Sequence, residues 1–251
     1  MSRKKIAALI MSALVAVCVI GGSLAYFKSQ DIEVNRFTTI GDPDDGGSDI
    51  DIVENFTPPE DVKPGDTTTK EVQVKNTDKY NQLIRVHFDI KLLDDNGNVV
   101  DKIEVKNGPD GTVGTVITAA DLKGYLTLNF DQANVVDTLE GATEKQWFRA
   151  DKDNPQDSYY YYLGFVSPDQ CTAKLLDSVN LSLDAGNPYK GIKYKIDVIA
   201  DGVQAANGAF KEDFKNDSKY NADLEAALEA AEKTDGSVDM IQTIADAEAK
   251  G

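Results

Sequence analysis

The chain has 251 residues, with 26 basic and 43 acidic side chains, a formal charge of −17 and a single histidine. This length is sufficient for one large domain with a hydrophobic core, or for two small domains. An acidic surface repels phosphate groups, so the charge argues against nucleic acid as a partner. Chemistry that depends on histidine would have to rely on His87 alone, which nearly excludes a His-rich metal centre or a Ser-His-Asp hydrolase.

The N-terminal end of the chain has the composition of a secretory signal peptide. A basic triplet at residues 3–5 precedes an uncharged apolar run at residues 6–20, and small residues follow at Ser23 and Ala25. That order is typical of a charged n-region, an apolar h-region and a cleavage site. The apolar run is short for a membrane span, so an uncleaved anchor is the less favoured alternative. We predict signal cleavage between Ala25 and Tyr26 and a secreted mature protein.

Signal cleavage would remove Cys18 and leave Cys171 as the remaining cysteine. The mature chain could then form no intramolecular disulfide, even in an oxidising compartment. No histidine lies near Cys171 in the sequence to activate its thiol. A half-buried structural thiol is therefore the better interpretation than a catalytic nucleophile.

Between residues 31 and 200 the dominant pattern is an alternation of apolar and polar side chains. In residues 83–92 the even positions are apolar and the odd positions after Leu83 are polar, which is typical of a half-buried strand. A turn signal at residues 94–98 leads into residues 99–105 and predicts a hairpin. Similar alternation recurs at residues 72–74, 126–130, 179–183 and 192–198. Seven or more strands without intervening helical patterns predict a mainly β, antiparallel sandwich.

Helical patterns are short or late in the chain. Residues 118–122 have the pattern of a single helical turn, and residues 221–231 are rich in strong helix formers. Asn221 is the expected N-cap of the later helix, and Leu224 and Leu228 lie on one face of it. A further helical pattern covers residues 238–249. Because both apolar stripes are narrow, we predict an acidic helical extension that docks weakly.

Several short motifs occur in an order that resembles a known family. The motifs are Gly-Gly-Ser-Leu-Ala-Tyr-Phe at 21–27, Asn-Arg-Phe-Thr-Thr-Ile-Gly at 35–41, Ile-Asp-Ile at 50–52, Val-Lys-Pro-Gly-Asp at 62–66 and Val-Lys-Asn-Thr at 74–77. Together with the tyrosine block at 159–162 and the segment 194–205, they resemble the TasA/camelysin family of proteins exported by Gram-positive bacteria. The resemblance rests on the order of the motifs over residues 3–205. An insertion at residues 42–47 and the acidic tail depart from the family pattern.

The resemblance implies a jelly-roll-like sandwich that polymerises head to tail into extracellular fibres of a biofilm matrix. It also implies a signal peptidase of the SipW type as a partner, and other matrix proteins as further partners. In this family the freed N-terminal segment can leave its own subunit and add as a strand to the next one.

Residues 26–40 have the amphipathic composition that a donated strand requires. The expected apolar anchors are Tyr26, Phe27, Ile32, Val34, Phe37 and Ile40. An ordinary first strand within its own sheet requires the same pattern, so both arrangements stay open for the monomer.

These patterns predict that the chain is divided into four segments. We predict a signal peptide at residues 1–25, an N-terminal donor strand segment at 26–40, a jelly-roll-like β-sandwich at 41–205 and an acidic helical extension at 206–251.

Metal-binding and catalytic patterns are weak in this sequence. An oxygen-rich cluster comprises Asp42, Asp44, Asp45, Asp49 and Asp51. It departs from an EF-hand, because Gly46 and Val53 occupy ligand positions, so a solvated acidic loop is the preferred interpretation over a Ca²⁺ site. His87 alternates onto the polar face of its strand, where we expect it to be exposed. We therefore predict no catalytic residue, no bound metal and no cofactor.

Two other classes of function share some of these features. A surface adhesin or carbohydrate-binding sandwich could use the tyrosine block at residues 159–162, although alternation predicts two core and two surface tyrosines there. A secreted metallopeptidase is the less favoured alternative, because camelysin gave the family that label while this sequence lacks a His-Glu-x-x-His motif.

Overall fold

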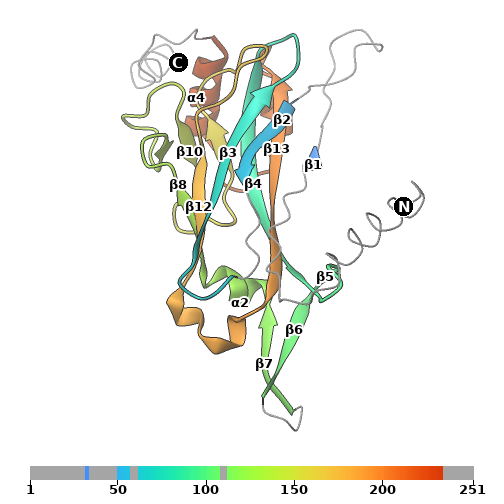
Figure 1. Cartoon of the computed structure of the whole chain (residues 1–251). Coiled ribbons are helices and arrows are strands. Elements are labelled where there is room, and N and C mark those ends of the chain that lie inside the picture. The colour runs from blue at the N-terminus through green and yellow to red at the C-terminus, as the bar shows by residue number, and fades with distance from the viewer. Residues whose placement is uncertain (1–31, 34–49, 57–61, 108–111, 234–251) are drawn as a thin grey trace, which may run out of the picture.

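The computed structural model describes residues 32–33, 50–56, 62–107 and 112–233. Strands predominate among them, which confirms the predicted mainly β fold (Figure 1). They form a large sheet, a small sheet and a separate two-stranded ribbon. Most neighbouring strands are antiparallel, while two pairs on the large sheet, β1 with β13 and β9 with β10, are parallel. A jelly-roll path of the chain stays a prediction.

The large sheet is built around two twelve-residue strands. Its order is β1 (Ile32–Glu33), β13 (Lys193–Gln204), β4 (Gln82–Leu93), β11 (Tyr160–Tyr162), β10 (Trp147–Arg149) and β9 (Val135–Val136), with β5 (Val99–Val100) also paired to β4. Strands β13 and β4 pair along their whole length, from Lys193 opposite Leu93 to Gln204 opposite Gln82. The small sheet has the order β2 (Ile50–Phe56), β3 (Thr67–Asn76), β12 (Leu176–Leu181) and β8 (Leu126–Phe130).

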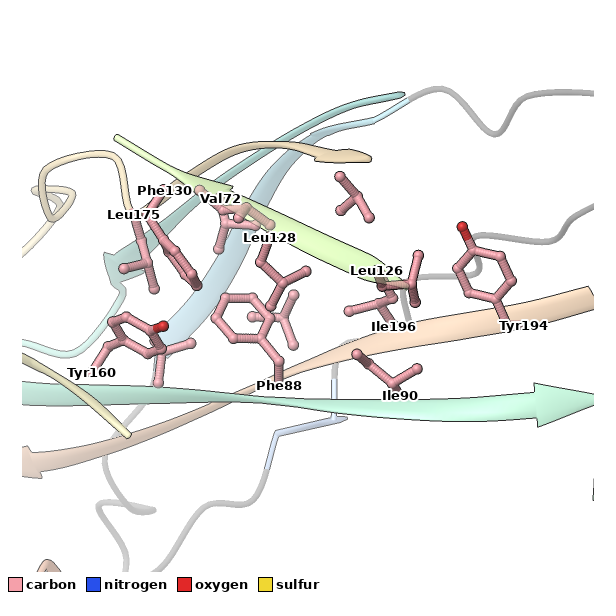
Figure 2. Packing of buried hydrophobic residues seen from close by; sticks show 14 of the residues in the cluster. Val72, Phe88, Ile90, Leu126, Leu128, Phe130, Tyr160, Leu175, Tyr194 and Ile196 are labelled. Carbon is pink, nitrogen blue, oxygen red and sulfur yellow. The ribbon is translucent and has the colours of Figure 1, made fainter. Parts of the chain in front are cut away.

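The main hydrophobic core lies between the two sheets. The even positions of β4 from Ile84 to Leu92 and of β13 from Tyr194 to Ala200 belong to it, as the period-two pattern predicted. Phe88, Phe130 and Tyr160 come from three strands and meet in its centre, with ring centroids 4.5 Å apart for Phe130 and Tyr160 and 5.8 Å apart for Phe88 and Phe130 (Figure 2). Aromatic contacts between the sheets add specific geometry to the gain from apolar burial.

A second hydrophobic cluster covers the opposite face of the large sheet. It includes Leu83 and Val203 from the long strands, Phe210 from α3 (Phe210–Asp213), and the buried face of α4 (Ala222–Lys233). Leu224 and Leu228 are completely buried, so the expected weak docking of this helix is wrong. The predicted cap is confirmed, because the Leu224 amide donates a 3.0 Å hydrogen bond to Asn221 Oδ1.

The predicted hairpin after β4 forms over a shorter length than expected. Leu92 pairs with Val100 and Leu93 with Val99, and the chain then leaves the sheet. Strand β6 (Lys102–Asn107) pairs with β7 (Thr112–Thr118) in a ribbon that projects from one end of the sandwich (Figure 1).

The short helices lie in the connections between strands. The predicted turn after β7 is confirmed as α2 (Ala119–Lys123), in which Thr118 and Asp121 form a capping box. Two 3₁₀ turns, η1 (Leu183–Ala185) and η2 (Asn187–Tyr189), connect β12 to β13.

Candidate functional site

On one side the large sheet ends with the short strand β1, which pairs with the outer edge of β13 at two described positions. Ile32 lies opposite Ile199 and Glu33 lies opposite Ala200, in parallel orientation. The strand itself has twelve residues, so β1 covers a small part of this edge within the described chain. Unpaired backbone groups on a long edge strand are a template for another strand.

The small sheet ends on the same side of the sandwich. Its edge strand β2 pairs with β3 alone and contacts β13 across the gap between the sheets. Figure 1 shows β2, β13 and β1 grouped on this side. We call this side, formed by these three strands, the open edge.

The interior side of the open edge is lined mainly by apolar residues. On β13 these are Tyr194, Ile196, Val198 and Ala200, all of which belong to the main core. On β2, Ile50 is buried, while Ile52 and Phe56 are partly buried and pack on the same core. A strand that pairs with β13 here can place alternate apolar side chains against this surface.

One ion pair interrupts this apolar lining. Lys70 on β3 alternates with Val72 and Val74, so its side chain lies between the sheets, where it is 1% exposed. Its Nζ is 2.8 Å from Glu54 Oε1 on β2 and 4.8 Å from the ring centroid of Phe56. The glutamate side chain is 10% exposed, so both charges are largely removed from water. Sequence alternation could have identified Lys70, because a lysine occupies a core position of a strand.

The outer face of β13 and β4 next to the open edge bears a small lattice of charges. Like charges lie directly opposite each other, with Asp197 paired to Asp89 and Lys195 paired to Lys91. Ion pairs offset this repulsion. Lys91 Nζ lies 2.9 Å from Asp89 on its own strand and 3.2 Å from Asp197 diagonally across on β13, and Lys195 Nζ lies 2.8 Å from Asp197 on its own strand. The hydrogen bond with Asp89 raises the pKa of Lys91, so the lysine stays charged.

A buried arginine joins the large sheet to the C-terminal segment. Arg85 on β4 contacts Asp201 on β13 and donates from Nη1 to the Phe214 carbonyl at 3.0 Å. Its guanidinium also lies over the rings of Tyr159 and Phe214, at 4.3 and 4.7 Å from their centroids. Burial opposes the charged form, but the charge interactions and hydrogen bonds with Asp201 and Tyr161 together outweigh this effect and raise the pKa of Arg85.

His87 lies beside this arginine and is half-buried, so the predicted exposure of His87 is wrong. Its ring centroid is 4.7 Å from that of Tyr159. Burial lowers its pKa, and Nδ1 has no hydrogen-bond partner in the described part of the chain. Within that part, no group of three or more His, Cys, Asp or Glu residues could hold a metal ion.

Residues 1–110 match the family model described as camelysin metallo-endopeptidase. This N-terminal part of the chain is therefore similar to the TasA/camelysin family. This confirms the resemblance seen in the ordered motifs, and the matched region contains β2, β3 and β4. No curated protein and no solved structure matches the chain.

The similarity to the TasA/camelysin family bears on the proposed donor residues, of which the structure describes one. Ile32 lies in β1 at the open edge. The remaining anchors and the predicted cleavage site lie outside the described residues, namely Tyr26, Phe27, Val34, Phe37, Ile40 and Ala25. The helix predicted at residues 238–249 also lies outside them. No helix in the described ranges is long and apolar enough to cross a membrane.

Of the five acidic residues in the candidate Ca²⁺ loop, the structure describes one. Asp51 lies exposed on β2, while Asp42, Asp44, Asp45 and Asp49 lie outside the described residues. The solvated-loop interpretation therefore stays a prediction.

The burial of individual side chains corrects two further expectations. Tyr160, Tyr161 and Tyr162 are buried and Tyr159 is half-buried, instead of two being on the surface, because both faces of the large sheet are covered. Cys171 is exposed and not half-buried, and it lies outside the named strands in an isolated bridge with Lys75 of β3.

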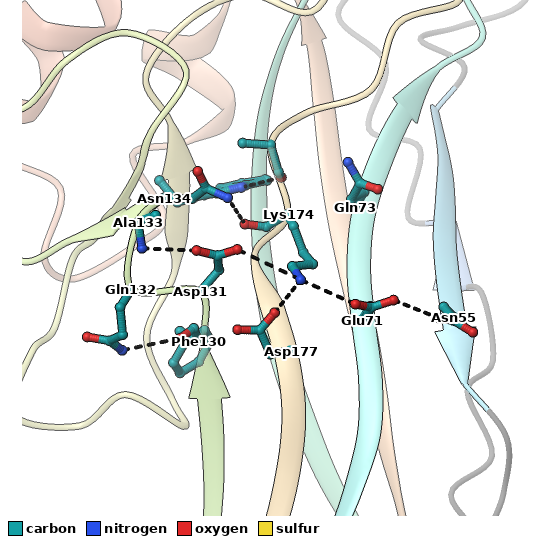
Figure 3. Close-up of polar contacts among 12 residues, drawn as sticks. Asn55, Glu71, Gln73, Phe130, Asp131, Gln132, Ala133, Asn134, Lys174 and Asp177 are labelled. Carbon is teal, nitrogen blue, oxygen red and sulfur yellow. Dashed lines mark hydrogen bonds and ion pairs between the residues drawn. The ribbon is translucent and has the colours of Figure 1, made fainter.

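A polar network crosses the outer face of the small sheet (Figure 3). Lys174 Nζ lies 2.6 Å from Asp177, 3.2 Å from Glu71 and 3.9 Å from Asp131. Asn55 on β2 donates to Glu71 at 2.7 Å, and this bond, followed by Lys174, lowers the pKa of Glu71. The network holds the edge strand β2 to the rest of its sheet.

Proposed function

We propose that this protein is a secreted structural subunit that polymerises into extracellular fibres of a biofilm matrix. Its partner is a second copy of itself, and the contact is made by donation of residues 26–40 to the open edge of the next subunit. A signal peptidase of the SipW type releases that segment, and other matrix proteins are further partners. The protein is proposed to act without catalysis and without a cofactor.

The single observation that carries this proposal is the pairing of β1 with β13. It brings a piece of the N-terminal segment to the outer edge of a long strand that has apolar side chains on its interior side. The same main-chain bonds can be made by the segment of another copy, because they do not depend on which chain supplies it. A head-to-tail contact of this kind does not close on itself, so repetition produces a filament.

Electron microscopy of the mature protein after incubation tests this proposal. Filaments are expected from the unaltered mature chain. Deletion of residues 26–40, or replacement of both Phe37 and Ile40 by Asp, should abolish them, because a charge in an apolar strand site costs several kcal/mol without a partner. Replacement of Val116 by Asp on the exposed ribbon is the matched control, since this side chain is 47% exposed. Unchanged filaments from the deleted chain would exclude strand donation.

The description of the matched family favours a second candidate, a secreted metallo-endopeptidase. The side chain that such chemistry would have to use is His87, which is half-buried beneath Tyr159. Zymography of the mature chain and of its His87→Ala variant separates the two candidates. Hydrolysis that disappears in the variant would establish the peptidase function.

The burial of the tyrosine block removes the observation that favoured an adhesin or carbohydrate-binding function. That alternative relied on exposed aromatic side chains at residues 159–162, which are buried or half-buried. A glycan array with the mature protein is the corresponding test, and we expect no binding.

A further inference from the structure

The chain contains Asn-Gly pairs at residues 96–97, 107–108 and 207–208. An Asn-Gly peptide is prone to deamidation, because glycine has no side chain to hinder the attack of its backbone nitrogen on the asparagine side chain. Gly108 lies outside the described residues. The pair at 207–208 lies in the connection between β13 and α3, where the C-terminal segment leaves the large sheet. Its chemistry therefore bears on how that segment is attached.

The backbone explains why this reactive pair is present. Asn207 and Gly208 both have positive φ, 59° and 69°, and the Ala209 amide donates to the Ala206 carbonyl at 3.3 Å. A tight turn with positive φ at both central residues strongly favours Asn-Gly. Asn207 is also exposed. The fold thus keeps a deamidation-prone pair where water can reach it.

A carboxylate from α4 holds the nitrogen that would react. The Gly208 amide donates a 3.0 Å hydrogen bond to Glu232 Oε1, close to the end of this helix. An ion pair between Lys211 and Glu229 ties the following turn to the same helix. Both contacts exist while α4 is docked on the large sheet.

The hydrogen bond opposes the movement that deamidation requires. A succinimide ring fixes ψ of the asparagine far from the value of a left-handed residue, so the peptide plane between Asn207 and Gly208 must rotate before the ring can close. This rotation carries the Gly208 N–H away from Glu232 and breaks a hydrogen bond to a charged acceptor. The reaction therefore needs a local opening of the turn.

We propose that Asn207 is a site of spontaneous deamidation and that Glu232 of the docked helix restrains the reaction. The Gly208 nitrogen attacks Cγ of Asn207, so that the N–Cγ bond forms, the Cγ–Nδ2 bond breaks, and ammonia leaves with the proton of the backbone nitrogen. Water then opens the succinimide to aspartate or to isoaspartate. The sequence of steps consumes water alone and involves no change of oxidation state.

The products would alter the attachment of the C-terminal segment. Isoaspartate lengthens the main chain by one carbon, three residues before Phe210, which is completely buried in the second cluster. Either product also adds a negative charge beside the Gly208 amide, whose acceptor is the carboxylate of Glu232. Because deamidation is not reversed by redocking, the covalent state of residue 207 records how long α4 has been undocked.

The experiment follows deamidation of the full mature chain during incubation at mildly alkaline pH. Peptide mapping by mass spectrometry, with separation of the Asn, Asp and isoaspartate forms, gives the rate at each position. Glu232→Ala should raise the rate at Asn207 about tenfold, which is the size of one hydrogen bond to a charged group. Glu232→Gln keeps a neutral acceptor, so its rate should lie between those of Glu232→Ala and the unaltered chain.

Two controls belong to the same experiment. Asn96 is the internal control, because the Gly97 amide donates to the Asp94 carbonyl at 3.0 Å and does not depend on α4. Its rate should be the same in the unaltered chain and in the Glu232 variants. Glu212→Ala is the matched variant, since Glu212 is an exposed carboxylate of α3 that pairs with Lys215, and it should leave the rate at Asn207 unchanged.

Three results would overturn the inference. Absence of conversion at Asn207 in every variant would reject the site. A lower or unchanged rate in Glu232→Ala would reject the restraint, and a lower rate would instead identify Glu232 as a base that activates the Gly208 nitrogen. Equal acceleration at Asn96 and Asn207 would trace the effect to opening of the whole chain and not to this hydrogen bond.

Discussion

Arg85 and Asp201 face each other directly across β4 and β13, and Asp201 Oδ2 lies 2.8 Å from Arg85 Nε and 2.7 Å from Arg85 Nη2. The arginine side chain is 1% exposed, and it also reaches the Phe214 carbonyl. The pair therefore joins the two central strands and holds the C-terminal segment against them.

Removing the acidic partner should destabilise the protein strongly. Asp201→Asn leaves a buried guanidinium without its counter-charge, and we expect a loss of about 3 kcal/mol in the free energy of unfolding. Urea denaturation of the mature chain measures this loss. Asp137→Asn is the control, since its pair with Arg149 is more exposed and should contribute less than about 1 kcal/mol. Similar small losses for both variants would contradict the assigned role of Arg85.

The helix α4 should behave as part of the folded body. Leu228 is completely buried in the second cluster, so Leu228→Ala should lower the free energy of unfolding by about 3 kcal/mol. Leu183→Ala is the matched control, because Leu183 is 74% exposed and its loss should change stability by less than about 0.5 kcal/mol. Equal midpoints of urea unfolding for the two variants would support a weakly docked tail instead.

His87 should make stability depend on pH in the mildly acidic range. Burial lowers its pKa in the folded chain, whereas the unfolded chain has the ordinary value of about 6.5. The unfolded state therefore binds a proton more readily, so this contribution to stability is complete above pH 6.5 and decreases as the pH falls below it.

The measurement is the unfolding free energy of the mature chain between pH 7.5 and 5, about one unit either side of the ordinary histidine pKa. The His87→Gln variant should show a flatter dependence than the unaltered chain over this interval. Identical profiles for the two proteins would show that His87 titrates normally in the folded state.

Signal processing should yield a mature chain that begins at Tyr26. Ser23 and Ala25 are the small residues that a signal peptidase requires before the cleaved bond. Mass spectrometry of the secreted protein measures the N-terminus directly. A start more than a few residues away, or retention of residues 6–20, would contradict both the export and the assembly proposals.

An added N-terminal tag should block fibre growth. The tag would have to be accommodated at the open edge together with the donated segment, where a continuous strand must form. Electron microscopy of tagged and cleaved protein makes the comparison, and growth that resumes on removal of the tag is expected. Filaments of the tagged chain with unchanged morphology would favour contacts through another surface.

The amino-acid sequence by itself determined the strands of the central sandwich. Apolar side chains at every second position share one face only when the backbone is extended, so this pattern requires a strand. The sequence also determined the capped turn at Thr118 and the Asn221 cap, since these depend on hydrogen bonds over three residues. The resemblance to the TasA/camelysin family followed from the order of short motifs, and the family-model match over residues 1–110 supports it.

Tertiary structure alone decided what covers the second face of the large sheet. The polar pattern of Arg85 and His87 indicated a solvent-exposed face, yet the C-terminal segment packs there and Asp201 compensates the arginine. Tyr161 and the apolar face of α4 belong to the second hydrophobic cluster because the C-terminal segment packs on this face. Burial of this kind depends on contacts between segments more than a hundred residues apart, such as Arg85 with Phe214. Local periodicity contains no information on them, because it reports the shape of one segment and not what packs against it.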